Sequence, residues 1–303
     1  CEHRFNLIDG TNQMTKTFYY CIADFRIAVS GLADVDALLP SFRPFRCGSC
    51  EEAQLLFRFD VLPQRSAPIG NIVEVGLFDS DLGHVQLTRG GGRYYVNLRY
   101  KDGEVHEMMA NQSFTQLQTY ICLHDRYAGE ALNSLLRIAF SQAILARGGI
   151  SIHASAVVHL GRAYLFMGKS GTGKSTHASL WLSCFPGSEL LNDDNPILRL
   201  QEHSVFAYGS PWSGKTPCYK NQRCELGGVA RLVQATTNRF MPQESENAFI
   251  ALLSSCSVVH KDTVLYDSLC NTLAELVERI SVGILQCEPN CDAAKKCAAA
   301  FIK

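Results

Sequence analysis

The sequence has no apolar run long enough to cross a bilayer. A membrane-spanning helix needs about 20 predominantly apolar residues, and no stretch of the chain approaches that length. The first residues also lack the basic region and apolar segment of a secretory signal. We therefore expect no membrane partner.

An excess of charge of either sign is absent as well. The chain has 28 Lys and Arg against 29 Asp and Glu, a net charge of −1 and an isoelectric point near 6.8. A strongly basic chain would point to nucleic acid or an anionic surface. Because this chain is balanced, we expect no nucleic-acid partner, although a local basic patch is compatible with the balance.

Cysteine, in contrast, is plentiful, but its pattern lacks the features of a metal or disulfide framework. The 13 cysteines are odd in number and scattered through apolar segments, which predicts mostly buried, reduced thiols. Cys47 and Cys50 have C-x-x-C spacing, yet the only later close pair, Cys287 and Cys291, lies far away in an unlike context. Because a closed tetrahedral zinc site needs four ligands, this argues against structural zinc.

The length of 303 residues and a hydrophobic content of 47% predict two domains with separate cores. Residues 1–127 read as short extended segments between turns, and residues 71–109 as an antiparallel meander with tight turns at 79–83, 90–92 and 101–103. The histidines here, His84, His106 and His124, have no partner at ligand spacing and are interpreted as surface or satisfied residues. The sequence thus predicts a β-rich antiparallel N-terminal domain of unknown role.

The period changes to that of a helix over residues 129–147. Apolar residues recur at helical spacing, and Gly148 and Gly149 end the pattern. We place the domain boundary just before this helix, near Tyr127, so that residues 128–303 form the second domain. The helix could equally be the bridge between the two.

Residues 168–175 form a complete G-x-x-x-x-G-K-[ST] phosphate loop. An apolar strand is expected over 163–167 and a helix from Lys174 onwards, which is the context that the motif requires. Lys174 would reach the β- and γ-phosphates, and the hydroxyl of Ser175 would bind Mg²⁺. The predicted nucleotide-binding residues are Gly168, Lys169, Ser170, Gly171, Thr172, Gly173, Lys174, Ser175 and Thr176.

Two aspartates, Asp193 and Asp194, follow a short apolar segment after that helix. This pattern is typical of a Walker B strand end, where one carboxylate meets Mg²⁺ directly or through water. An acidic turn is the alternative. The spacing in sequence between Ser175 and these aspartates favours the metal interpretation.

Together with His153, Ala154, Ser155 and Ala156 before the loop, these residues resemble the HPr kinase/phosphorylase family, whose phosphate-loop fold is shared with phosphoenolpyruvate carboxykinase. The resemblance covers residues 150–302. It implies an α/β C-terminal domain of that P-loop fold, with ATP and Mg²⁺ as cofactors. The nucleotide motif favours an intracellular, cytoplasmic protein, and the leading interpretation is a kinase acting on a serine of a protein or peptide. By position the resemblance implies that His153 lies beside the loop, that Asp193 helps to hold metal and that Asp194 takes the proton from the acceptor.

Several points remain open at this stage. His153 is as well explained by a core histidine bonded to Ser155 or the backbone, and Lys215, in a loop resembling shorter relatives, by a surface lysine. Glu225 is a weak metal candidate. The rivals of a kinase are a nucleotide-binding regulator without transfer activity and, last, a decarboxylating carboxykinase. The sequence does not identify the acceptor and leaves homo-oligomerisation open.

Overall fold

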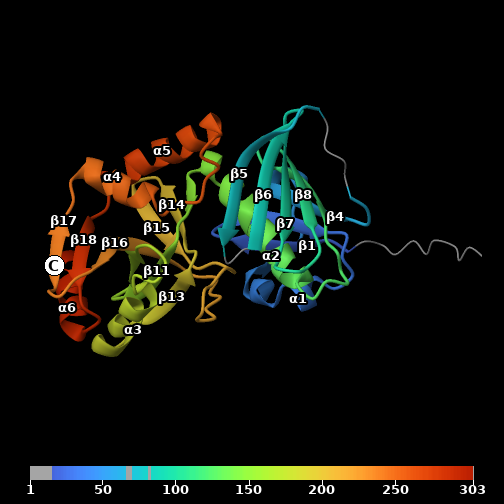
Figure 1. The fold of residues 1–303 in the computed structure, drawn as a ribbon. Helices are drawn as coiled ribbons and strands as arrows, with labels where there is room; N and C mark the ends of the chain where they lie inside the picture. Colours follow the sequence, from blue (N-terminus) through green and yellow to red (C-terminus); the bar gives the residue numbers. More distant parts are fainter. Residues whose placement is uncertain (1–15, 66–69, 81–82, 303) are drawn as a thin grey trace, which may run out of the picture.

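The chain folds around two β-sheets that lie beside each other (Figure 1). The structure, a computed structural model, describes residues 16–65, 70–80 and 83–302. The first sheet is built from the N-terminal part of the chain and the second from the C-terminal part. The protein is therefore a mixed, sheet-rich α/β protein, and the boundary near Tyr127 stays a prediction.

The first sheet has nine strands in the order β3-β1-β2-β4-β9-β8-β7-β6-β5. Three short helical segments lie between its early strands: α1 (Val35–Leu38), η1 (Pro40–Phe45) and η2 (Glu52–Gln54). The strands are β1 (Phe18–Ile22), β2 (Phe25–Ser30), β3 (Arg46–Cys47), β4 (Leu55–Leu62), β5 (Val73–Ser80), β6 (Gly83–Gly90), β7 (Arg93–Arg99), β8 (His106–Asn111) and β9 (Gln116–Tyr120).

The predicted meander is present, but the sheet is not wholly antiparallel. Strands β5 to β9 pair with their sequence neighbours in antiparallel fashion. Strand β4, however, runs parallel to both β2 and β9. Parallel neighbours need long crossover connections. The segment from α1 to η2 connects β2 to β4, and the strands β5 to β8 connect β4 to β9. Short-range turn signals in the sequence do not predict this parallel pairing.

The second sheet also has nine strands, with the central order β10-β14-β15-β16-β12-β11-β13. Strand β18 lies beside β16, and β17 lies beside β18. Its long strand β16 runs parallel to β12 and to β18. The strands are β10 (Gly149–Ser151), β11 (Ala154–His159), β12 (Arg162–Met167), β13 (Glu189–Asp194), β14 (Ile197–Gln201), β15 (Ser204–Tyr208), β16 (Arg223–Gln234), β17 (Arg239–Pro242) and β18 (Val282–Cys287).

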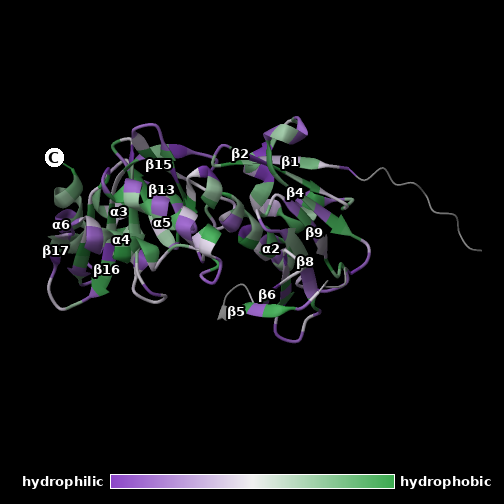
Figure 2. Ribbon diagram, turned by 90° about the horizontal axis from the view of Figure 1, so that it is seen from above, coloured by the Kyte–Doolittle hydropathy of each residue, from purple (hydrophilic) through white to green (hydrophobic). Residues whose placement is uncertain are grey.

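Four helices accompany the second sheet: α3 (Lys174–Cys184), α4 (Ser245–Leu253), α5 (Thr263–Val277) and α6 (Cys291–Phe301). Helix α5 is amphipathic and carries both hydrophilic and hydrophobic segments (Figure 2). It buries a stripe of leucines spaced three or four residues apart. The stripe consists of Leu265, Leu269, Leu273 and Leu276.

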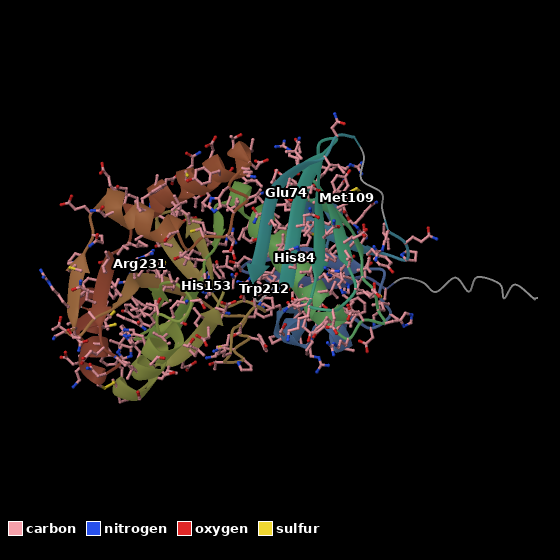
Figure 3. All side chains as sticks on the ribbon, viewed as in Figure 1. Glu74, His84, Met109, His153, Trp212 and Arg231 are labelled. Carbon is pink, nitrogen blue, oxygen red and sulfur yellow. A yellow bond between two sulfur atoms is a disulfide. The ribbon has the colours of Figure 1, made fainter. Side chains whose placement is uncertain are left out.

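Helix α2 (Ala128–Ala143) contacts residues of both halves. It packs on strands of the first sheet, where the ring of Phe140 meets that of Phe57 at 6.5 Å. Trp212, labelled in Figure 3, comes from the other half, and its ring lies 5.1 Å from that of Phe140. The Trp212 indole N–H also donates to the carbonyl of Asn133 on α2 at 3.3 Å. One continuous buried cluster consequently includes residues of both sheets.

A buried polar cluster makes a second connection between the halves. The hydroxyl of Tyr94 on β7 donates to the carboxylate of Asp262, and Arg89 on β6 lies 3.2 Å from the same carboxylate. Asp262 also caps α5, because it accepts from the backbone N–H of Leu265 at 2.9 Å. The start of α5 is thereby fixed to the first sheet.

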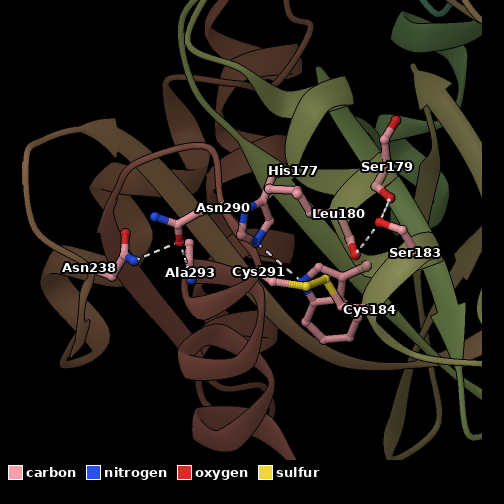
Figure 4. The surroundings of a disulfide bond; sticks show 10 residues. His177, Ser179, Leu180, Ser183, Cys184, Asn238, Asn290, Cys291 and Ala293 are labelled. Carbon is pink, nitrogen blue, oxygen red and sulfur yellow. Dashed lines mark hydrogen bonds between the residues drawn. A yellow bond between two sulfur atoms is a disulfide. The ribbon is translucent and has the colours of Figure 1, made fainter.

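A disulfide joins Cys184, at the end of α3, to Cys291, at the start of α6 (Figure 4). The expectation of reduced thiols is therefore wrong for this pair. The pairing could not be predicted, because two cysteines so far apart in sequence give no local signal. The other ten cysteines within the described ranges are free, Cys47 and Cys50 among them. No group of three or more metal-ligating His, Cys, Asp or Glu side chains occurs among the described residues.

Candidate functional site

The loop from Gly168 to Gly173 connects strand β12 to helix α3, as predicted. Strand β12 ends in the buried Met167, and α3 begins at Lys174. Gly171 and Gly173 have φ values of +79° and +102°, a region that residues with a Cβ rarely adopt. The N–H of Thr172 donates to the carbonyl of Lys169 at 3.1 Å. The loop is thus a tight turn that opens onto the N-terminus of a helix, where anions bind favourably.

Lys174 folds back across this loop. Its ammonium group donates to the carbonyls of Gly168 at 3.0 Å and Lys169 at 3.3 Å, and the residue is 9% exposed. Burial lowers the pKa of Lys174, whereas the charges of Asp194 and Asp193 act to raise it. A partly desolvated ammonium beside exposed loop residues is suited to bind a concentrated negative charge. Among the other predicted loop residues, Lys169, Ser170, Ser175 and Thr176 are exposed.

Asp193 is buried at the end of strand β13 and has one unused oxygen. Its Oδ1 accepts from the hydroxyl of Ser155 at 2.6 Å. Its Oδ2 is buried and finds no hydrogen-bond partner in the described part of the chain. Because an unpaired buried carboxylate oxygen is costly, a cation is the natural partner for it. Asp193 therefore fits the predicted role of a metal ligand.

The loop after strand β15 closes over Asp193. The N–H of Gly214 donates to the Asp193 carbonyl at 2.9 Å, and a Cβ on Gly214 would lie only 2.5 Å from that oxygen. Glycine is required by this close approach. Lys215, the next residue, is exposed, as in the surface-lysine interpretation.

Asp194 is held between two basic side chains. Its Oδ1 lies 2.9 Å from His153 Nδ1, and its Oδ2 accepts from Arg137 Nη1 at 2.8 Å. Burial alone would raise the pKa of Asp194, but the His153 hydrogen bond and the Arg137 charge outweigh it and lower the pKa. The carboxylate is therefore ionised at neutral pH and fixed in direction.

His153 orients an aspartate instead of bonding to Ser155. The hydroxyl of Ser155 points to Asp193, and the backbone N–H of His153 donates to the carbonyl of Ser255 at 2.8 Å. Strand β11, which carries Ser155, is paired with β13, which carries both aspartates. This pairing brings the three predicted catalytic and metal-binding side chains to one sheet end.

Sequence reasoning missed Arg137. The residue lies on α2, between the buried Leu136 and the partly buried Ile138. A single arginine within a helix that is otherwise largely apolar was the available signal, because such a charge needs a partner. That partner is Asp194, more than fifty residues further along the chain.

Two pockets of about 250 Å³ flank the loop. The helix-side pocket lies against the start of α3 and the ends of β16 and β18; it is lined by Gly171, Thr172, Gly173, Thr176, His177, Leu180, Leu232, Gln234, Cys287, Glu288 and Pro289. The strand-side pocket is lined by His153, Gly168, Lys169, Arg231, Ser254, Ser255, Cys256 and Ser257. Arg231, which sequence reasoning also missed, lies with His153 in the second half of the molecule (Figure 3).

The remaining candidates are not part of this site. Glu225 pairs with Arg162 at 3.5 Å, and Arg162 begins β12, whereas the phosphate loop follows its end. The metal interpretation of Glu225 is therefore not supported. His106 is a satisfied histidine, with its Nε2 at 3.1 Å from Asp125.

No helix within the described residues is long and apolar enough to cross a membrane.

A family model, phosphoenolpyruvate carboxykinase, matches residues 95–216. This segment holds the loop, both aspartates, His153 and Arg137, and it confirms the resemblance inferred from the sequence. It is less than half of the chain. It also begins within strand β7, so the likeness is not limited to residues 150–302 as we expected.

No curated protein matches the chain. Among solved structures, the HPr(Ser) kinase/phosphatase from Coxiella burnetii is similar at a TM-score of 0.30 and 11% sequence identity. The similarity covers 49% of this chain and 94% of that one.

Proposed function

We propose that this protein is an ATP-dependent kinase that transfers the γ-phosphoryl group to a hydroxyl, with a serine of a protein or peptide as the acceptor. The observation that carries the proposal is the Asp194 carboxylate, held by His153 and Arg137 beside the phosphate loop. The family match over residues 95–216 supports a kinase-like use of ATP.

In this proposal the loop residues bind the nucleotide phosphates. Their backbone N–H groups and the N-terminus of α3 favour negative charge, and Lys174 exchanges its bonds to the loop carbonyls for phosphate oxygens. The nucleoside extends into the helix-side pocket. The buried Trp181 and Phe166 pack behind that pocket and fix the side chain of His177.

Ser175 and the unpaired oxygen of Asp193 would hold Mg²⁺, an ion commonly bound by one or two protein oxygens together with phosphates. The ion would neutralise charge that develops on the transferred group. The absence of a larger cluster of ligands among the described residues is consistent with this use of substrate oxygens.

The acceptor hydroxyl would enter from the strand-side pocket. Asp194 accepts its proton as the bond to phosphorus forms, and His153 and Arg137 keep the carboxylate ionised and pointing in a fixed direction. Phosphoryl transfer depends mainly on positioning and charge stabilisation. A base with a lowered pKa is adequate here, because the proton moves only as the oxygen becomes acidic.

The experiment is transfer of labelled phosphate from ATP into a proteome extract, followed by single-turnover kinetics on the labelled acceptor. Asp194→Asn should retain nucleotide binding and lose about 10²–10⁴-fold in transfer rate, because the amide cannot accept the proton. Asp193→Asn should instead raise the Mg²⁺ concentration that transfer requires. Asp267→Asn, on the exposed side of α5, is the matched control.

A rate for Asp194→Asn equal to that of the parent, or one restored by Mg²⁺ alone, would favour the nucleotide-binding regulator. The carboxykinase alternative stays last, because the further lysine and histidine metal ligands and the arginine for a carboxylate substrate that it would need are not assigned in the sequence.

A further inference from the structure

A third cavity, the junction pocket, lies between the two sheets and has no role in the steps above. Its volume is about 310 Å³. The first sheet contributes Val85, Leu87 and Val96, and helix α2 contributes Arg137, Ile138, Ser141 and Gln142. The segment from Cys256 to His260 closes the third side.

The junction pocket adjoins the candidate site. It shares Cys256 and Ser257 with the strand-side pocket. Arg137 lines the junction pocket, whereas His153 lines the strand-side pocket, and both basic side chains contact Asp194. Each pocket is therefore lined by one of the two side chains that hold the proposed base, and the two pockets share wall residues at 256–257.

The polar groups that helix α2 places in the wall of the junction pocket are already paired with the protein. The Gln142 side chain accepts from the N–H of Val259 at 3.0 Å, and its amide donates to Ser141 at 3.0 Å. Ser141 in turn donates to the carbonyl of Ile138 at 3.0 Å. Arg137 is neutralised by Asp194. These groups need no further partner, and Val85, Leu87, Val96, Ile138, Val258 and Val259 supply apolar walls. Ser257 and His260 are the remaining polar residues of the lining. The pocket is therefore suited to a mainly apolar occupant.

We propose that the junction pocket binds a large apolar side chain next to the serine that is phosphorylated. The inference rests on the proposed kinase function and narrows its substrate class to peptide segments in which a bulky apolar residue neighbours the acceptor serine. One extended residue advances the chain by about 3.3–3.6 Å, so neighbouring side chains of a peptide could enter two pockets that share lining residues. The first sheet would then contribute to substrate selection.

The test uses the full chain and synthetic serine peptides of equal length. The residue on one or the other side of serine is Gly, Leu, Phe or Lys. Two readouts are measured for each peptide: kcat/KM with Mg-ATP, and the dissociation constant with Mg-ADP by fluorescence anisotropy. Leu and Phe peptides should exceed the Gly peptide by about tenfold or more in both, as expected for an apolar group entering a fitted pocket.

Two variants change the pocket without touching the catalytic groups. Val258→Phe narrows it and should abolish the preference for Leu and Phe, with the Gly peptide and ATP affinity unchanged. Ile138→Ala widens it and should shift the preference from Leu towards Phe. Val264→Phe is the matched control, because Val264 is 72% exposed on α5, and it should behave as the parent.

Equal values for all peptides, or a preference that neither Val258→Phe nor Ile138→Ala alters, would overturn the proposal. If no peptide is phosphorylated, the kinase function fails for these acceptors. The dissociation constants then still test the pocket proposal. A preference in peptide affinity that the two variants change supports the proposal, and equal affinities for all peptides reject it.

Discussion

Arg137 and Asp194 form a 2.8 Å ion pair in which a helix packed on the first sheet holds a carboxylate at a strand end of the second. The two side chains are 20% and 18% exposed, so the pair is partly shielded from solvent. Removing one member would leave the other charge without its nearest partner, which is more damaging in such a place than on an open surface. This relationship links the site to the half of the chain that carries no catalytic motif.

We predict that Arg137→Met lowers the transfer rate by up to about 10²-fold, the scale of a misdirected catalytic group. Arg137 helps to lower the pKa of Asp194, so its loss raises that pKa. Since the base must be ionised, the acid limb of the pH–rate profile should move to higher pH. Arg126→Met, at a side chain that is 67% exposed, is the control. If the acid limb of the Arg137→Met profile lay at the same pH as that of the parent, the positioning role of Arg137 would be rejected.

We predict that Lys174→Ala weakens Mg-ATP binding by about 10–10²-fold, because hydrogen bonds to a charged group contribute about 1.5–3 kcal/mol. Isothermal titration calorimetry measures this directly. Lys215→Ala, at an exposed lysine, should leave affinity unchanged. Equal affinities for the parent and Lys174→Ala would contradict the phosphate-loop assignment.

We predict an acid-sensitive contribution to stability from His177. Burial lowers the pKa of His177 from 6.5 to about 4. Below pH 6.5 His177 is protonated in the unfolded chain but stays neutral in the folded chain. The contribution of His177 to the free energy of unfolding is therefore fully present above pH 6.5 and is lost as the pH falls to 4. With about 1.4 kcal/mol for each pKa unit, the loss is about 3 kcal/mol.

His177→Gln removes this titration while keeping an acceptor for the Trp181 indole, which donates to His177 at 3.2 Å. Urea unfolding between pH 7 and pH 4 compares the two proteins. The difference in their free energy of unfolding should shrink as the pH falls. A constant difference would show that His177 does not titrate in this interval.

We predict that reduction of the Cys184–Cys291 disulfide destabilises the protein by about 2–4 kcal/mol, because the bond restricts a long loop in the unfolded chain. The sequence separation is 107 residues. Thermal unfolding with and without a phosphine reductant measures the effect. In a Cys184→Ser/Cys291→Ser protein the reductant should have no effect. A shift there equal to that of the parent would show that the loss does not come from the Cys184–Cys291 bond.

The parts that could be predicted from sequence are those whose signals are local. The phosphate loop with its strand and helix, and the two aspartates at a strand end, each occupy one short stretch. Arg137 and Arg231 could not be placed, because their partners are brought to them only by sheet and helix packing. For the same reason the parallel pairing of β4 and the partner of Cys184 were missed.

The buried bond between Tyr94 and Asp262 has a consequence for the order of events during synthesis. The two residues are 168 positions apart, so the strand that carries Tyr94 leaves the ribosome long before its acceptor is made. Until Asp262 is made, the Tyr94 hydroxyl lacks this hydrogen-bond partner, and burying the hydroxyl would be unfavourable. The first sheet can therefore pair its strands early but reaches its final packing only after α5 has emerged.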